Sequence, residues 1–317
     1  MSLFSSFSDS PAPGVAVEIA SSHVSAASLD WRGGSPVVAA HADEPLPEGA
    51  LVPALTAANA HHADAVAGAL GRVLERVGRP RRVGLIVPDV VSKVSLVKFE
   101  RVPKAQGDLD QLVKWQVRKT APFPIEEAQV SYVPGWRAED GQEFIVSLAR
   151  RAVVEEYEGL CARAGAHAGL VDISTFNVVN AVLAGAMPPA ADWLLVNVAA
   201  DYVTIALLRG PHLIFFRNRA ADAEGTLVDL VHQTTMYYED RLQGAGFTRA
   251  ILAGAAGGAD LDDLRRSIEE RVKSPVDFID PTGAAALTDR ITAAPTLLGT
   301  LAPLVGLLLR DRERATA

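Results

Sequence analysis

Two stretches that lie far apart in the chain align with each other without a gap. Val15–Leu29 reads VAVEIASSHVSAASL, and Asp192–Leu208 contains VNVAADYVTIALL. Each stretch has an apolar strand, a turn of small residues and a second, alternating strand, which is the pattern of a β-hairpin. Because the same hairpin opens each half of the chain, the sequence predicts a duplicated domain whose two halves face each other across a cleft.

The alignment matches the two hairpins at the positions that contact the phosphates in hairpins that bind ATP. Glu18 aligns with Asn197, and Ala20 aligns with Ala199. A phosphate-binding hairpin needs an acid to hold the metal or its waters, and glycine so that backbone amides can approach the phosphates. Of these four positions only Glu18 keeps the required chemistry, so we expect the hairpins to indicate ancestry rather than a working nucleotide site.

Other hydroxyls and glycines fall where they would complete such a site. The turn Ala253–Gly258 is rich in glycine and alanine, follows a predicted strand and precedes a predicted helix. The simpler interpretation is that these turns only connect strands. We predict no catalytic residue and no bound cofactor, ATP and magnesium included, and a vestigial cofactor site made of Glu18, Ser21, Ser22, Asn197, Thr204, Gly254 and Gly257.

Composition and charge exclude several other classes of function. The formal net charge of −8 disfavours nucleic-acid binding, which needs a basic face. Cys161 is the only cysteine, which excludes disulfide bonds and CxxC sites and fits a reducing cytoplasm. His61 and His62 fall within a helix predicted over Ala54–Val77, where adjacent side chains face different ways, so no metal site is expected.

Neither end of the chain predicts a membrane anchor. Residues 1–14 have no basic region and no long apolar run, and we expect a flexible tail there. Ala293–Leu309 is uncharged for 17 residues, but it is short for a membrane span and contains two prolines and two glycines. We therefore expect a buried terminal helix.

The order of predicted elements indicates that a segment with a different arrangement of strands and helices is inserted into the first half. Three strands, a helix and a strand fill residues 15–92, and a strand, an amphipathic helix and a hairpin fill residues 93–150. We predict an inserted α+β subdomain at 93–150, a first lobe formed by 15–92 and 151–187, and a second lobe at 190–317.

The inserted segment contains a large share of the few aromatic residues. A segment of this size buries only some of them, and Trp and Tyr are favoured at protein interfaces. The alternative is that they form its small core. The predicted partner-binding residues are Val113, Trp115, Phe123 and Tyr132, and we expect one or two of the aromatic residues to line a groove for a partner segment.

These segments carry a resemblance to a known family. Leu109–Pro134 (LDQLVKWQVRKTAPFPIEEAQVSYVP) resembles the helix, the Pro-Phe signature, the acidic pair and the Tyr-bearing strand of the PilM family of type IV pilus assembly proteins, relatives of the actin-like division protein FtsA. Supporting matches are Met1–Phe7, Ala164–Val182 and Pro303–Arg310. The resemblance implies an α/β, bilobed actin-like (ribonuclease H-like) duplicated fold with an inserted small α+β subdomain and a reduced second lobe.

The same resemblance implies partners and a location. Family members hold the cytoplasmic N-terminal segment of the membrane protein PilN in a groove beside the inserted subdomain, and form a ring or platform under the inner membrane. For this chain the resemblance therefore implies a PilN-like partner, a homo-oligomer or ring, indirect contact with pilus ATPases, and a peripheral position at the cytoplasmic face of the inner membrane.

The chain departs from the family members that bind ATP. Arg217–Gly225 runs almost directly into the predicted helix Thr226–Leu242, so the subdomain that would cover the nucleotide is missing. The function that this implies is a non-catalytic adaptor. The alternatives are an active actin-like ATPase, in which Glu18 and Ser21 hold metal and phosphate, and the cytoplasmic domain of a type II secretion L-type protein.

Overall fold

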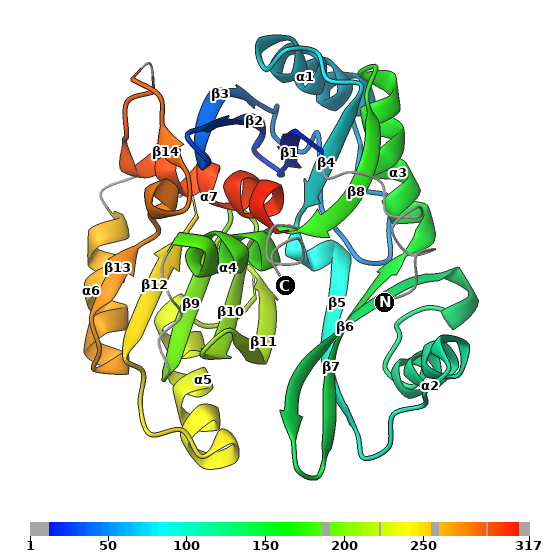
Figure 1. Ribbon diagram of the computed structural model, residues 1–317, viewed down its shortest axis with the longest axis vertical. Coiled ribbons are helices and arrows are strands. Elements are labelled where there is room, and N and C mark those ends of the chain that lie inside the picture. Colours follow the sequence, from blue (N-terminus) through cyan, green and yellow to red (C-terminus); the bar gives the residue numbers. More distant parts are fainter. Residues whose placement is uncertain (1–12, 186–190, 222, 255–259, 290, 311–317) are drawn as a thin grey trace.

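Two large sheets, one small sheet and the helices that cover them make up the protein (Figure 1). The computed structural model describes residues 13–185, 191–221, 223–254, 260–289 and 291–310. The predicted bilobed, duplicated α/β fold with an inserted subdomain is confirmed.

The first large sheet contains the first predicted hairpin. Its strands are Val15–Ile19 (β1), His23–Arg32 (β2), Ser35–Pro45 (β3), Arg82–Val87 (β4), His167–Ile173 (β8) and Ala286–Leu287 (β14), and the helices on its outer face are Ala63–Arg76 (α1) and Arg151–Arg163 (α3). The strand order is β14-β3-β2-β1-β4-β8. β1 is antiparallel to β2 and parallel to β4, and β4 is parallel to β8. β1 and most of β4 are buried, which accounts for their largely apolar sequences.

The second large sheet repeats this plan. Its strands are Asp192–Val198 (β9), Tyr202–Arg209 (β10), His212–Ala220 (β11), Arg249–Ala253 (β12) and Val276–Phe278 (β13), and the helices Leu227–Leu242 (α5) and Asp260–Val272 (α6) cover its outer face. The order β11-β10-β9-β12-β13 matches β3-β2-β1-β4-β8 strand for strand. A short link joins β11 to α5, so this lobe is reduced, as predicted.

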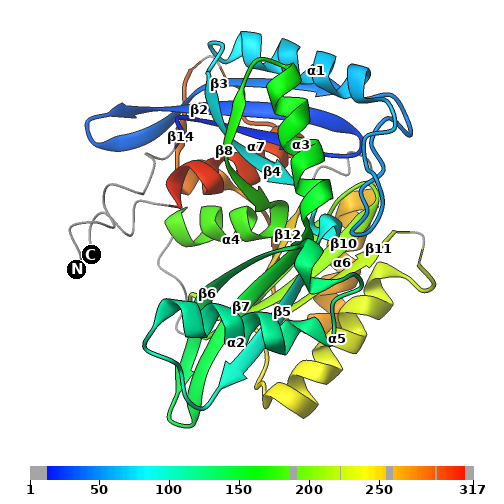
Figure 2. The ribbon, with the colours of Figure 1, turned by 90° about the vertical axis from the view of Figure 1, so that its right-hand side faces the viewer.

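The inserted subdomain is an antiparallel sheet with one helix on it. Its elements are Ser92–Phe99 (β5), Gln106–Arg118 (α2), Ala128–Ala138 (β6) and Gly141–Arg150 (β7), in the strand order β5-β7-β6. In β7 the large apolar residues Phe144, Val146 and Leu148 are buried against α2, whereas the residues between them are half-buried on the opposite face. α2 therefore occupies one face of the small sheet and leaves the other face to the rest of the protein (Figure 2).

Two helices, Ser174–Gly185 (α4) and Pro295–Leu309 (α7), lie between the large sheets (Figure 1). Leu301, Leu304 and their neighbours in α7 pack on the first sheet, and Val178 of α4 packs on the second. α7 is apolar on all sides, so burial between two layers is the arrangement that removes it from water. This confirms the expected buried terminal helix, and no helix among the described residues is long and apolar enough to cross a bilayer.

The predicted range of the second lobe, 190–317, is wrong at its C-terminal end. β14 pairs with β3 at the edge of the first sheet, and α7 packs on that sheet's inner face. The chain therefore completes the second sheet at β13 and then returns to the first lobe.

The helix predicted over Ala54–Val77 is shorter in the structure, where α1 begins at Ala63. The fully buried Asn59 side chain hydrogen bonds the backbone of the preceding loop, and the carboxylate of Glu156 accepts two backbone N–H groups there. These side chains satisfy the backbone in an irregular loop, so helix formation is not needed. His61–His62 consequently precede the helix instead of lying within it.

Candidate functional site

The two predicted hairpins have the same geometry and face each other across the cleft. Glu18 pairs with Ser25 across the first hairpin, and Asn197 pairs with Thr204 across the second. Each turn is closed by one backbone hydrogen bond of 2.9 Å between equivalent residues. The alignment made from sequence is therefore correct to the residue.

Both positions that would carry a metal-binding acid are engaged inside the protein. Glu18 accepts a 2.7 Å hydrogen bond from the hydroxyl of Ser174, and Asn197 donates a 2.9 Å hydrogen bond to the hydroxyl of Thr175. Ser174 and Thr175 are the first residues of α4, so this helix ties the two hairpins together. Burial raises the pKa of the Glu18 carboxyl, and His23 and the Ser174 hydroxyl oppose that shift.

A third acid, Asp89, joins the same network, and sequence reasoning missed it. It lies two residues after the end of β4, with Pro88 between them, and is fully buried. Its carboxylate accepts hydrogen bonds from the backbone N–H of Thr175 at 2.9 Å, from the Thr175 hydroxyl, and from Oγ1 of Thr204 at 2.6 Å. Burial raises the pKa of the Asp89 carboxyl, and these donors oppose the shift. An acid at the carboxyl end of a buried parallel strand was the available signal.

The two hairpin turns also contact each other directly. Ser21 Oγ donates a 2.9 Å hydrogen bond to Asp201, while Ser22 Oγ lies 3.1 Å from the ring of its neighbour His23. The cavity that remains among the described residues at this point has a volume of about 90 Å³. Pockets for drug-sized ligands and cofactors are about 300–1,000 Å³. The cleft as described is filled by its own side chains.

The backbone conformation and packing at Gly254 require a glycine. It has φ of +111°, and a Cβ at this position would lie 1.9 Å from the carbonyl oxygen of Val198 at the end of β9. The other predicted glycine, Gly257, lies outside the described residues. Among the described residues, no group of three or more His, Cys, Asp or Glu side chains could hold a metal ion.

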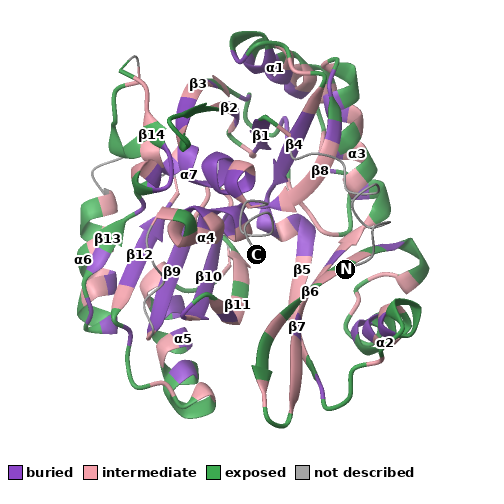
Figure 3. Cartoon of the chain, viewed as in Figure 1, coloured by how far each residue is buried: buried purple, intermediate pink, exposed green. Residues whose placement is uncertain are grey.

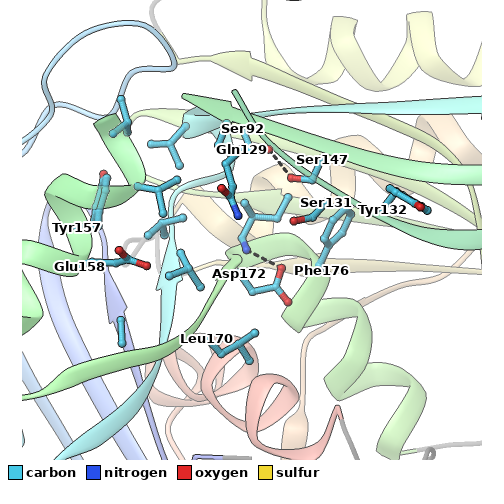
Figure 4. Close-up of a pocket in the computed structure, with 18 of the residues that line it drawn as sticks. Ser92, Gln129, Ser131, Tyr132, Ser147, Tyr157, Glu158, Leu170, Asp172 and Phe176 are labelled. Carbon is cyan, nitrogen blue, oxygen red and sulfur yellow. Dashed lines mark hydrogen bonds between the residues drawn. The ribbon is translucent and has the colours of Figure 1, made fainter. Parts of the chain in front are cut away.

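A larger cavity, of about 420 Å³, lies between the inserted subdomain and the first lobe, and we call it the subdomain groove. Its floor is the face of the small sheet opposite α2, and its walls are β8, α3 and the start of α4 (Figure 4). The floor residues come from alternate positions of β6 and β7, and they are Gln129, Ser131, Val133, Ile145, Ser147 and Ala149.

The wall formed by β8 has a distinct geometry. Six consecutive residues, Ala168–Ile173, line the groove. Because successive strand residues point to opposite faces, a cavity lined by all of them runs along the edge of the strand and not over one face. β8 is the last strand of the first sheet, so no described strand pairs with it on that side.

Both polar and apolar side chains line the groove. Arg310 donates a 2.8 Å hydrogen bond to Asp172, and burial raises the pKa of the Asp172 carboxyl while Arg310 opposes that shift. The hydroxyls of Ser92 and Ser147 lie 2.6 Å apart on the floor. Most other lining side chains are apolar, which is the usual composition of a ligand-binding cleft.

Of the four residues predicted to bind a partner, only Tyr132 lines this groove. Val113 is fully buried in the core of the subdomain, and Phe123 is half-buried against that core. Trp115 is 59% exposed, but it lies on α2, which covers the other face of the small sheet. These three residues lie on the α2 side of the small sheet, whereas the groove lies on its opposite face.

The fold is similar to that of several solved structures. A chain of a "PilM-PilN type IV pilus biogenesis complex" matches with a TM-score of 0.78 and 17% identity over 96% of this chain and 99% of that one. A protein from Bacteroides thetaiotaomicron with an actin-like ATPase fold matches with a TM-score of 0.50 and 8% identity, over 94% of this chain and 98% of that one. At these identities the likeness confirms the actin-like fold.

A cytoplasmic domain of EpsL, an inner-membrane component of the type II secretion system of Vibrio cholerae, has a TM-score of 0.48 and 10% identity, over 96% of this chain and 94% of that one. The sequence model of the family described as "Type IV pilus assembly protein PilM" matches residues 16–240, which is more than half of the chain. The chain therefore belongs to the PilM family of type IV pilus assembly proteins.

Proposed function

We propose that the protein is a non-catalytic adaptor of the type IV pilus assembly machinery, and that the subdomain groove binds the N-terminal segment of a PilN-like membrane protein. In this proposal the protein works at the cytoplasmic face of the inner membrane and does not hydrolyse ATP. The main observation behind this proposal is the difference in volume between two cavities. The groove beside the inserted subdomain has about 420 Å³, whereas the cleft between the hairpins keeps about 90 Å³.

The shape of the groove supports an extended peptide as the occupant. An unpaired strand edge offers a row of backbone N–H and C=O groups to a further strand, and β8 presents such an edge along the groove. A peptide that pairs with β8 directs alternate side chains onto the floor of the small sheet. Backbone pairing supplies affinity in this mode, and the polar and apolar side chains of the floor select the side chains of the peptide.

The filled cleft supports an adaptor without nucleotide chemistry. Three polar residues of the vestigial site donate hydrogen bonds within the protein: Ser21 to Asp201, Asn197 to Thr175, and Thr204 to Asp89. A nucleotide would have to break these bonds and separate the lobes before it could bind. The structural likeness to a chain of a PilM–PilN complex supports the choice of partner.

Binding of a labelled peptide from the N-terminus of the neighbouring PilN-like protein tests the proposal. Fluorescence anisotropy with the full chain is expected to give saturable binding with one site. Ser131→Trp places a large side chain on the groove floor, and it should weaken binding by at least about tenfold because it fills the space that the peptide needs. Ser35→Trp, the same change at an exposed strand residue of the first lobe, is the matched control and should bind normally.

Two results would contradict the proposal. One is an absence of peptide binding by the unmodified chain, and the other is equal binding by the Ser131→Trp variant. An actin-like ATPase is the competing function, and turnover of Mg-ATP with no binding of the peptide would favour it. The homo-oligomeric ring and the indirect contact with pilus ATPases stay predictions of the family resemblance.

A further inference from the structure

The exposed face of α2 has a composition that neither the fold nor the groove explains. Leu109, Val113 and Val117 form the buried side of this helix. The side of α2 that faces away from the small sheet is exposed (Figure 3). By helical spacing it carries Lys114, Trp115 and Arg118, and Lys119 follows as the C-cap. We call the set Lys114, Trp115, Arg118 and Lys119 the α2 outer face.

The cations of this face have no acidic partner. Among the described residues, no carboxylate lies within ion-pair distance of Lys114, Arg118 or Lys119. Some other surface cations are paired, for example Arg79, just after the end of α1, with Glu75. In a chain with a net charge of −8, an unpaired cationic cluster stands out against its surroundings.

The aromatic residue of the face is also without a packing role. Trp115 is 59% exposed, and Lys119 Nζ lies 5.5 Å from the centroid of its ring. Leaving an indole in water costs free energy, since its large apolar ring is then hydrated. A further cation, Lys93, lies at the end of this helix, where its Nζ donates a hydrogen bond to the backbone carbonyl of Thr120.

We propose that the α2 outer face docks on the surface of an anionic phospholipid bilayer. Such a surface provides negative charges for the unpaired cations and an apolar environment for the exposed indole. Its phosphate layer attracts Lys and Arg, with a contribution of about 1 kcal/mol per residue near the surface. Its interfacial region is where Trp is enriched in membrane proteins, because the indole is apolar with one polar N–H.

The charge of the whole chain gives this contact an orientation. An anionic surface repels a molecule with a net charge of −8 except where cations cluster. Docking through α2 places the small sheet next to the bilayer, with the subdomain groove on the far side of that sheet. Tyr132 connects the two sites, because it lines the groove and its hydroxyl hydrogen bonds to Asp110 of α2. A membrane-tethered peptide in the groove would thus be held by a protein that touches the same membrane, which is the part of this inference that rests on the proposed function.

Vesicle flotation with the full chain tests the proposal. Vesicles of phosphatidylcholine with added phosphatidylglycerol should carry the protein at low ionic strength, whereas vesicles of phosphatidylcholine alone should not. Salt should release it, because the attraction between exposed charges is screened. The variant K114Q/R118Q/K119Q, which keeps good helix formers, should lower the partition coefficient about a hundredfold, from roughly fivefold per charge.

A matched control removes three exposed cations elsewhere. The variant R32Q/R241Q/K273Q changes the net charge equally but leaves α2 intact, and it should bind vesicles as the unmodified chain does. Fluorescence gives a second readout. Binding should shift the tryptophan emission to shorter wavelength, and Trp115→Phe should abolish that shift while Trp31→Phe, at another exposed tryptophan, should keep it.

Three outcomes overturn the proposal. The first is that the unmodified chain fails to float with anionic vesicles. The second is that the K114Q/R118Q/K119Q variant floats equally well. The third is that soluble polyglutamate binds to the α2 outer face while vesicles do not. The last outcome assigns the face to an acidic protein segment. Peptide binding in the groove is measured in solution without lipid, so failure of the membrane contact and failure of the proposed function are separate results.

Discussion

The hydroxyl of Ser21 donates a hydrogen bond of 2.9 Å to the carboxylate of Asp201, and this bond joins the turns of two hairpins that begin the two halves of the chain. In a nucleotide-binding relative of this architecture, the space between such turns would have to hold phosphates. Here the turns bind each other. The two lobes of the duplicated fold are therefore linked directly across the cleft.

A double-mutant cycle on this pair measures that cohesion. Ser21→Ala and Asp201→Ala should each lower the free energy of unfolding by about 1 kcal/mol, because each removes a partly buried hydrogen bond to a charged group. The double variant should cost clearly less than the sum, as read from urea unfolding. Ser22→Ala is the control, since that hydroxyl contacts only its neighbour His23, and it should cost less than about 0.5 kcal/mol. Strict additivity at Ser21 and Asp201 would show that the two turns are not coupled.

Thr204→Val tests the role of Asp89. The change keeps the shape of the side chain and removes one of the donors to a buried carboxylate, so it should lower the free energy of unfolding by about 1–3 kcal/mol. Thr234→Val is a matched control at an equally buried threonine whose hydroxyl bonds only a helix carbonyl, and a loss within about 0.5 kcal/mol is expected.

The cost of Thr204→Val should also depend on pH. The pKa of the Asp89 carboxyl is raised in the folded protein, so the native state holds this proton more tightly than the unfolded state does. Stability from this group is therefore present at acid pH and falls as pH rises from the unfolded pKa toward the folded one. Loss of the Thr204 donor raises the folded pKa further, so the penalty should be larger at neutral pH than in acid. An equal penalty at both would remove Asp89 from the explanation.

Asp192 should show the opposite pH dependence. Its carboxylate accepts two hydrogen bonds from Arg209, at 2.9 and 2.8 Å, and one from Tyr238 at 2.8 Å, and these contacts lower its pKa. A lowered pKa means that the stabilisation is present above the unfolded pKa and is lost as pH falls through the folded value. Asp192→Asn should cost about 2 kcal/mol at neutral pH, and thermal unfolding should show the cost shrinking in acid. The exposed Asp277, 3.6 Å from Arg249, is the control site, where Asn should be nearly neutral. A cost of Asp192→Asn that persists in acid would exclude the charge as its source.

Gly254→Ala tests whether this glycine is structural. The added methyl would lie 1.9 Å from the Val198 carbonyl oxygen, so the strand end or the turn has to move, and a loss of at least about 3 kcal/mol is expected. Gly33→Ala is the control at another glycine with positive φ and open surroundings, where only the backbone preference of about 1–2 kcal/mol applies. Equal losses, measured by urea unfolding, would mean that the contact with Val198 is relieved easily.

The parts of the fold that sequence predicted are those with a local signal. Each hairpin carries its own alternation and turn, so the pairing of Glu18 with Ser25 and of Asn197 with Thr204 follows from short stretches of chain. No local sequence pattern predicts where α7 packs. This helix is apolar on every side, and its sequence does not say which sheet it covers or that β14 joins the first sheet beforehand.

The candidate groove was only partly predictable for a similar reason. Its lining comes from β6, β7, β8 and α3, which are separated in sequence and meet only in the folded protein. The exposed Trp115 was an obvious candidate for a partner site, but the small sheet separates it from the groove. The alternation in β7, with Phe144 and Leu148 buried and Ser147 between them half-buried, contained the missing information about which face is free.

Hydrogen exchange on the full chain with two ligands tests the central claim most directly, because it locates binding as well as detecting it. The PilN-like peptide should slow the exchange of backbone amides in His167–Ile173, the edge strand of the groove, and Mg-ATP at millimolar concentration should leave the hairpin turns at residues 20–22 and 199–201 unchanged. Protection of those turns by Mg-ATP, together with no protection of the edge strand by the peptide, would contradict the account.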